Sequence, residues 1–182
     1  MAVKIRDVLI TEEEIRAKVE ELARRIDRDY RDYREAGGIL LVGVLRGAFI
    51  FLADLCRRLT VPVQVDFIAL SSYERSIETS GAVRLVMDLR SDIAGRHVLV
   101  VEDIVDSGYT MRYLLDSLAA RHPASLKVCA LVRKPQRLRV DVEVDYLGFD
   151  LPDVWVVGYG LDCLDEHRNL PYIAAVEPPA EG

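Results

Sequence analysis

The stretch from Val98 to Thr110, VLVVEDIVDSGYT, constrains the fold more than any other part of the chain. Its apolar run ends in the adjacent carboxylates Glu102 and Asp103, a short polar loop follows, and a helical pattern, MRYLLDSLAARH, comes next. An unbroken apolar run indicates a strand buried on both faces, as in a parallel sheet covered by helices. We therefore predict an α/β protein in which this strand is followed by an acidic loop that leads into the N-terminus of a helix.

The residue types of this loop suit a sugar phosphate. Backbone N–H groups of residues 106–110 can converge on a phosphate dianion, because Gly108 allows close approach and the helix adds its positive end. Glu102 and Asp103 can accept hydrogen bonds from both hydroxyls of a ribose 2′,3′-diol, either directly or around a magnesium ion. Together these features predict a ribose 5-phosphate site.

The segment EDIVDSGYT also resembles the 5-phosphoribosyl-1-pyrophosphate (PRPP) loop of type I phosphoribosyltransferases. The resemblance implies a twisted, mainly parallel sheet flanked by helices, with a small hood subdomain. It implies that Asp106 is the general base at N7 of a purine, and that Glu102 and Asp103 hold Mg²⁺. The alternative is a plain strand-to-helix turn whose acids only cap the helix. The loop residues implied to bind substrate are Glu102, Asp103, Ile104, Asp106, Ser107, Gly108, Tyr109 and Thr110.

Composition limits the class of protein. The 182 residues suit one α/β domain, and a net charge of −6 argues for a small-molecule partner and against a broad nucleic-acid surface. The widely spaced Cys56, Cys129 and Cys163 are predicted to be reduced packing residues. Neither a membrane-spanning run of roughly 20 apolar residues nor a secretion signal is evident, so a soluble, cytoplasmic protein is expected.

The N-terminal half contains a second strand-to-helix junction. A capping box at Thr11 and Glu14 predicts a helix from residue 12 to about 35, and ILLVGVL predicts a central strand at 39–45. The following VLRGAF resembles the pyrophosphate-binding loop of the hypoxanthine-guanine branch. This implies that Leu45, Arg46 and Gly47 lie near pyrophosphate, with a cis peptide between the first two. Many relatives carry lysine at the arginine position, so its contact stays open, and an ordinary turn with a surface arginine is the alternative.

Residues 61–70 and 83–89 are predicted to be antiparallel strands. The polar segment between them, SSYERSIETSGA, is longer than a tight turn. Its Ser72 and Tyr73 resemble the flexible loop of the family, which implies closure over the substrates to exclude water. A passive hairpin loop is the alternative.

The C-terminal half contains residues expected to bind a purine base. A strand at 126–133 ends at Lys134, and the resemblance implies that this lysine donates a hydrogen bond to O6 of a 6-oxopurine. Further strands are expected near 143–147, 154–157 and 172–176. The run PDVWVVGYGLD resembles the base-binding hood of the hypoxanthine-guanine branch. The resemblance implies stacking by Trp155, which could otherwise be a core tryptophan. It also implies substrate contacts from Val156 and Leu161, magnesium binding by Asp162 and pyrophosphate binding by Arg168.

These features lead to one prediction for the whole chain: a single phosphoribosyltransferase domain with its core at about 36–150 and a hood from the N-terminus and about 151–177. The expected reaction is purine salvage, in which PRPP and hypoxanthine or guanine give IMP or GMP and pyrophosphate with Mg²⁺. No nucleic-acid or membrane partner is expected, and the chain is expected to form a homodimer or homotetramer.

The sequence also bears on three alternatives. A phospho-accepting receiver domain would need a lysine after the FDLP segment, and no lysine follows Lys134. An RNA-binding regulator of the same fold would need a basic face. Adenine is disfavoured because its 6-amino group would oppose the lysine ammonium, whereas the preference among hypoxanthine, guanine and xanthine stays open.

Overall fold

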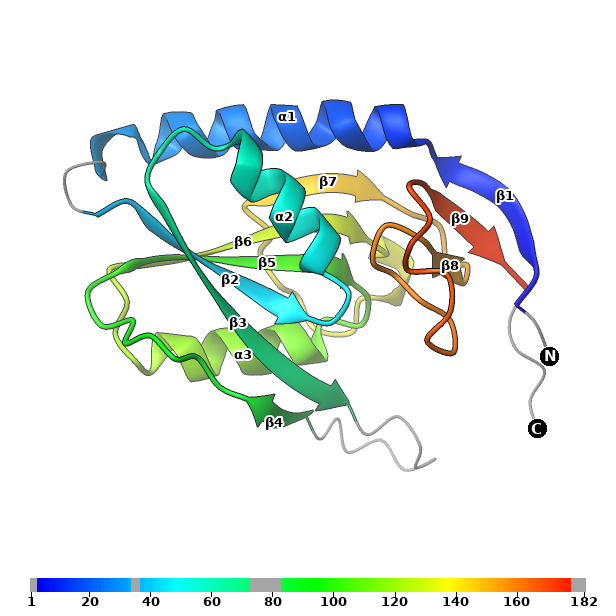
Figure 1. Cartoon of the computed structure of the whole chain (residues 1–182). Helices are drawn as coiled ribbons and strands as arrows, with labels where there is room; N and C mark the ends of the chain where they lie inside the picture. The colour runs from blue at the N-terminus through cyan, green and yellow to red at the C-terminus, as the bar shows by residue number, and fades with distance from the viewer. Residues whose placement is uncertain (1–2, 34–36, 73–82, 178–182) are drawn as a thin grey trace.

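The computed structural model describes residues 3–33, 37–72 and 83–177 (Figure 1). The three α-helices of this part are α1 (Glu12–Asp29), α2 (Phe49–Arg58) and α3 (Tyr109–Ala119), and the two short 3₁₀ turns are η1 (Arg31–Tyr33) and η2 (Pro135–Arg137). The strands are β1 (Ile5–Ile10), β2 (Ile39–Leu45), β3 (Val63–Ser72), β4 (Val83–Met87), β5 (His97–Val105), β6 (Ser125–Arg133), β7 (Tyr146–Asp150), β8 (Val156–Val157) and β9 (Ile173–Val176).

The main sheet has six strands in the order β4-β3-β2-β5-β6-β7. All neighbours are parallel except β3 and β4, which are antiparallel. Helices α1 and α2 cover one face and α3 covers the other (Figure 1). The predicted α/β class and the mainly parallel sheet are confirmed.

Alternate residues of the central strands enter two different hydrophobic clusters. Leu41 and its register partner Leu99 pack with α1 and α2, whereas Leu40 and its partner Val98 pack with α3. All four side chains are at most 1% exposed, and full burial of such a side chain contributes about 1.5–3 kcal/mol. The unbroken apolar run of each strand is therefore explained by helices on both faces.

A second, antiparallel sheet has the order β1-β9-β8, so the N-terminal strand pairs with the C-terminal part of the chain (Figure 1). We call this sheet together with residues 158–172 the hood, and residues 158–168 the hood loop. The Tyr159 hydroxyl of the hood loop donates to the Asp54 carboxylate on α2 at 2.6 Å. This contact ties the hood to the helix that follows β2.

Several predicted boundaries were wrong. The capping box of α1 is present, but the helix ends at Asp29 and not near 35, because Tyr30 turns its side chain into the core and η1 follows. The strand expected at 143–147 begins only at Tyr146. Just before it, the Asp145 carboxylate accepts a hydrogen bond from the Val128 N–H at 2.8 Å, in place of a backbone acceptor. Strand β1 was not predicted.

The sheet order reverses direction between β2 and β5. The chain proceeds from β2 outward to β3 on one side and from β5 outward to β6 on the other. The loops at the carboxyl ends of β2 and β5 therefore diverge and leave a crevice, the usual place for a ligand in such sheets. No helix in the described part of the chain is long and apolar enough to cross a membrane.

Candidate active site

A cleft of about 440 Å³ lies at this crevice. The loop after β2, the end of β5, the loop that leads into α3 and the hood loop all contribute to its wall. The predicted site residues that line it are Leu45, Arg46, Gly47, Glu102, Asp103, Ile104, Asp106, Ser107, Gly108, Thr110 and Asp162. The two predicted strand-to-helix junctions therefore form one site.

The acidic pair lies deep in this cleft. Glu102 and Asp103 are each only 8% exposed. Burial raises the pKa of both carboxyls, and the negative charge of Asp103 raises the pKa of Glu102 further. A Cβ atom at Gly47 would overlap the Asp103 carboxylate, so these two residues are in contact and a larger residue at position 47 would displace that carboxylate. The loop after β2 thus lies directly beside the acidic pair.

The loop at 106–110, expected to bind the 5-phosphate, packs closely against residues 139–140. Gly108 precedes α3 with a φ of +86°, and a Cβ there would overlap the Val140 carbonyl oxygen. The Ser107 carbonyl accepts the N–H groups of Arg139 at 2.9 Å and Val140 at 3.2 Å. No side chain caps the N-terminus of α3, so its first N–H groups can bind an anion.

Asp106 and Arg137 line the cleft and form a charged group with Lys134, which is not among the lining residues. The Lys134 Nζ atom is 3.9 Å from the Asp106 carboxylate, whose other oxygen accepts from Arg137 Nε at 2.6 Å. Burial lowers the pKa of the Lys134 ammonium, and the nearby Asp106 charge opposes that shift. Arg137 lines the cleft, yet no sequence signal singled it out.

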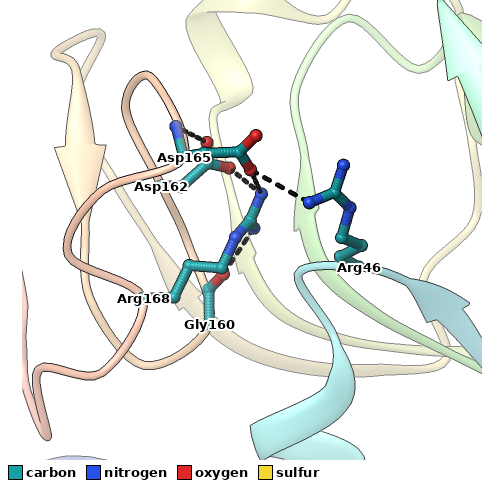
Figure 2. Close-up of polar contacts among 5 residues, drawn as sticks. All are labelled: Arg46, Gly160, Asp162, Asp165 and Arg168. Carbon is teal, nitrogen blue, oxygen red and sulfur yellow. Dashed lines mark hydrogen bonds and ion pairs between the residues drawn. The ribbon is translucent and has the colours of Figure 1, made fainter.

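The two arginines expected to bind pyrophosphate, Arg46 and Arg168, approach each other at Asp165 of the hood loop (Figure 2). Arg168 pairs with Asp162 at 2.7 Å and donates to the Gly160 carbonyl at 2.9 Å. It also pairs with Asp165 at 2.9 Å, and the same carboxylate oxygen is 3.3 Å from Arg46. The structure thus brings Arg46 and Arg168 together through Asp165, a residue without a predicted role. The Leu45–Arg46 peptide is cis, as the resemblance implied.

The residues expected around the base lie in and beside β8. Trp155 is 53% exposed, so the alternative of a core tryptophan was wrong. Val156 and Leu161 are buried. Both backbone groups of Leu161 bond to Gly158 at 3.0 Å, which leaves its side chain a packing role beneath the hood loop.

Other predicted residues are not among those that line the cleft. Tyr109, at the start of α3, is 48% exposed and is not a lining residue. Ser72 ends β3, and Tyr73 lies outside the described residues together with most of the expected flap. Within the described part of the chain, no three His, Cys, Asp or Glu residues form a metal-binding cluster. Asp162 faces Arg168, although it lines the same cleft as the acidic pair.

Comparisons with known proteins agree with this geometry. A family model described as a phosphoribosyl transferase domain matches residues 9–163. The chain is 49% identical to a hypoxanthine-guanine phosphoribosyltransferase of Mycobacterium avium, over 96% of this chain and 87% of that protein. It is 46% identical to the hypoxanthine phosphoribosyltransferase of Escherichia coli, over 93% and 94%.

Solved structures give the same answer. A hypoxanthine-guanine phosphoribosyltransferase of Bacillus anthracis superposes with a TM-score of 0.87 and 44% identity, over 97% of this chain and all of that one. The fold is that of a nucleotide-forming transferase. The chain belongs to the phosphoribosyltransferase family, and within it to the hypoxanthine-guanine branch. The predicted family, fold class and enzyme class are confirmed.

Proposed function

We propose that this chain transfers the 5-phosphoribosyl group of PRPP to N9 of hypoxanthine or guanine, which gives IMP or GMP and releases pyrophosphate. One observation carries the proposal: Asp103 at the end of β5 lies against Gly47 in the loop after β2. The acidic residues suited to a ribose and the loop suited to pyrophosphate therefore share one cleft. PRPP carries both groups on the same sugar.

The sugar phosphate would lie along β5 and the start of α3. The loop 106–110 and the uncapped helix N-terminus suit the 5-phosphate. Glu102 and Asp103 would take the ribose hydroxyls. Their buried oxygens also fit Mg²⁺, a hard cation that one or two carboxylates can hold together with substrate oxygens. Bound there, the ion would supply positive charge to the pyrophosphate and offset the repulsion between the two carboxylates.

During the reaction, the bond between the ribose C1 and the pyrophosphate oxygen breaks, and a bond from C1 to purine N9 forms. Arg46 and Arg168 would stabilise the negative charge that develops on the leaving group. The purine loses the proton on N7 as N9 attacks. Asp106 would accept that proton, and general base catalysis of this kind typically contributes about 10² to 10⁴ in rate.

The purine would lie between the end of β6 and the hood. The Lys134 ammonium is a donor only, so it suits the O6 acceptor of a 6-oxopurine and opposes the 6-amino group of adenine. Trp155 is exposed enough to stack on the ring. The backbone of the neighbouring Val156 would meet the base edge.

Initial rates with PRPP, Mg²⁺ and each of hypoxanthine, guanine, xanthine, adenine and uracil test this proposal. We expect turnover with hypoxanthine and guanine, and adenine and uracil should react far more slowly. A protein that consumes PRPP with none of these bases, or that prefers adenine, would contradict it.

We also propose that the enzyme acts as a homodimer or homotetramer. On the sheet face that carries α1 and α2, Val65 and Phe67 of β3 remain 43% and 36% exposed, and neighbouring exposed apolar side chains are typical of protein interfaces. Light scattering coupled to gel filtration tests this proposal. A Phe67→Glu variant should shift the mass towards the monomer, and a wild-type mass of about 20.5 kDa would contradict the proposal.

A further inference from the structure

The carboxylate of Asp165 lies between two arginines that come from different parts of the fold (Figure 2). Its Oδ1 atom is 2.9 Å from Arg168 in the hood loop and 3.3 Å from Arg46 in the loop after β2. The same oxygen thus connects both cations assigned above to pyrophosphate. An anionic side chain of the protein occupies the positions where an anionic group of the substrate is expected.

The hood loop holds Asp165 in place but leaves its carboxylate accessible. Leu164 and Asp165 have φ values of +57° and +61°, and the Asp165 N–H donates to the Asp162 carboxylate at 2.8 Å. The Asp165 side chain is nevertheless 63% exposed. Hydrogen bonding to Arg168 and the charge of Arg46 lower the pKa of its carboxyl, so it is ionised at neutral pH.

The two arginines depend on Asp165 to different extents. Arg168 keeps a second carboxylate, Asp162, and the Gly160 carbonyl, so it stays anchored without Asp165. For Arg46, Asp165 is the one ion-pair partner found within the described residues, and its own side chain is 73% exposed. Removal of the Asp165 charge would therefore free Arg46 and relieve Arg168 of one of its two acidic partners.

We propose that Asp165 is a tethered competitor of pyrophosphate. Its carboxylate neutralises Arg46 and Arg168 in the empty enzyme, gives way when the more highly charged pyrophosphate binds, and returns to the arginines as the product leaves. This inference rests on the pyrophosphate position given under Proposed function. Exposed ion pairs are weak, so the competition should lower pyrophosphate affinity by about two- to tenfold and not block the site.

A positioning role for Asp165 would change pyrophosphate affinity in the opposite direction. If the carboxylate served to hold the two arginines in their binding positions, its removal would weaken pyrophosphate binding. A competitor, by contrast, tightens binding when it is removed. The direction of the change therefore distinguishes the two roles.

The decisive measurement is the dissociation constant of pyrophosphate with Mg²⁺, determined by calorimetry for the full-length wild type and for Asp165→Asn. Asparagine preserves the side-chain shape and tolerates a positive φ. We expect pyrophosphate to bind the variant about two- to tenfold more tightly, and to inhibit the forward reaction more strongly as a product. The matched control is Glu166→Gln, which removes the same charge from the next residue, whose carboxylate lies 3.7 Å from His167 Nε2 and not beside an arginine. The control should leave the dissociation constant within about twofold of the wild type.

Unchanged or weaker pyrophosphate binding in Asp165→Asn would overturn the inference, as would equal tightening in the control. Arg46→Ala separates this failure from failure of the proposed function. If Arg46→Ala weakens pyrophosphate binding and Asp165→Asn does not tighten it, only the competitor role is wrong. If the wild type binds pyrophosphate weakly and Arg46→Ala changes nothing, the pyrophosphate site and the competitor role are both wrong.

Discussion

Gly160 of the hood loop lies directly on Gly47 of the loop after β2, so that a Cβ atom at Gly160 would overlap the Gly47 carbonyl oxygen. The other side of Gly47 faces the Asp103 carboxylate. The hood, the loop after β2 and the acidic pair are therefore stacked through one glycine. A residue larger than glycine at position 160 would push the hood loop away from the loop after β2.

Gly160→Ala should destabilise the protein and impair its activity. Its φ of +101° strains any L-residue, and the added methyl meets backbone that cannot rotate away. We expect a loss of about 1–3 kcal/mol in unfolding free energy, measured by urea denaturation, together with a raised KM for PRPP. Gly37→Ala is the control, because Gly37 has a φ of +93° and open space around it. An equal loss in both variants would show that conformational strain, and not the contact with Gly47, is responsible.

Asp106→Asn should lower kcat at least about tenfold with little change in the KM for PRPP, because the amide keeps its shape but accepts no proton. Initial rates at saturating hypoxanthine measure this. Asp153→Asn is a matched control, since Asp153 pairs with the same Arg137 at 3.5 Å without lining the cleft. A near-normal kcat in Asp106→Asn would remove Asp106 from the role of general base.

Lys134→Met should abolish the preference for a 6-oxo group and leave PRPP affinity nearly intact, because the lost donor addresses the base alone. Dissociation constants for PRPP and GMP test this. Lys127→Met is the control, because Lys127 lies on β6, the strand that Lys134 follows, and its ammonium is 5.6 Å from the Tyr146 ring centroid and not beside Asp106. If Lys134→Met weakens the binding of PRPP and GMP equally, the whole site is disrupted, and the specific contact between Lys134 and the base is contradicted.

Trp155 is the only tryptophan, so the indole fluorescence of the protein reports one position. GMP with Mg²⁺ should change the emission strongly, and PRPP should change it less. Stacking contributes about 1–3 kcal/mol, so Trp155→Ala should weaken GMP binding roughly ten- to a hundredfold, and Trp155→Phe should restore most of it. Unaltered emission and normal GMP binding by the alanine variant would place the purine elsewhere.

Local sequence predicted those parts of the structure that depend on neighbouring residues. The loop from Glu102 to Thr110 was recognisable because the acids, the glycine and the helix start are contiguous. The end of α1 was misplaced because burial of Tyr30 depends on the tertiary core. Strand β1 was missed because it exists through pairing with β9, more than 160 residues away.

The same limit applies to the site. Arg46 and Arg168 were predicted from motifs, but the residue that joins them, Asp165, could not be recognised without the fold of the hood loop. Arg137 likewise contacts Asp106, 31 residues earlier in the chain, and Asp153, 16 residues later. In both cases a side chain reaches across from a different element, and no spacing in the sequence records such a contact.

The burial of the acidic pair allows its binding role to be separated from its effect on stability. The pKa values of Glu102 and Asp103 are raised in the folded protein, so the folded state holds these protons more tightly than the unfolded state. Their contribution to stability is therefore greatest in acid and is lost as the pH rises through the raised pKa values. Replacement of both by amides should not reduce the unfolding temperature at neutral pH, and any loss of activity then reflects lost binding.

The most direct test of the central claim is therefore the double variant Glu102→Gln/Asp103→Asn, assayed over ranges of PRPP and Mg²⁺ concentration. Our account predicts a KM for PRPP raised by about tenfold or more and a higher magnesium requirement, because the amides lose the charge that binds the ribose hydroxyls and the cation. The KM for hypoxanthine should change little. A double variant with unchanged KM for PRPP and an unchanged magnesium requirement would show that the pair is only structural, and would contradict the assignment of this cleft as the site of phosphoribosyl transfer.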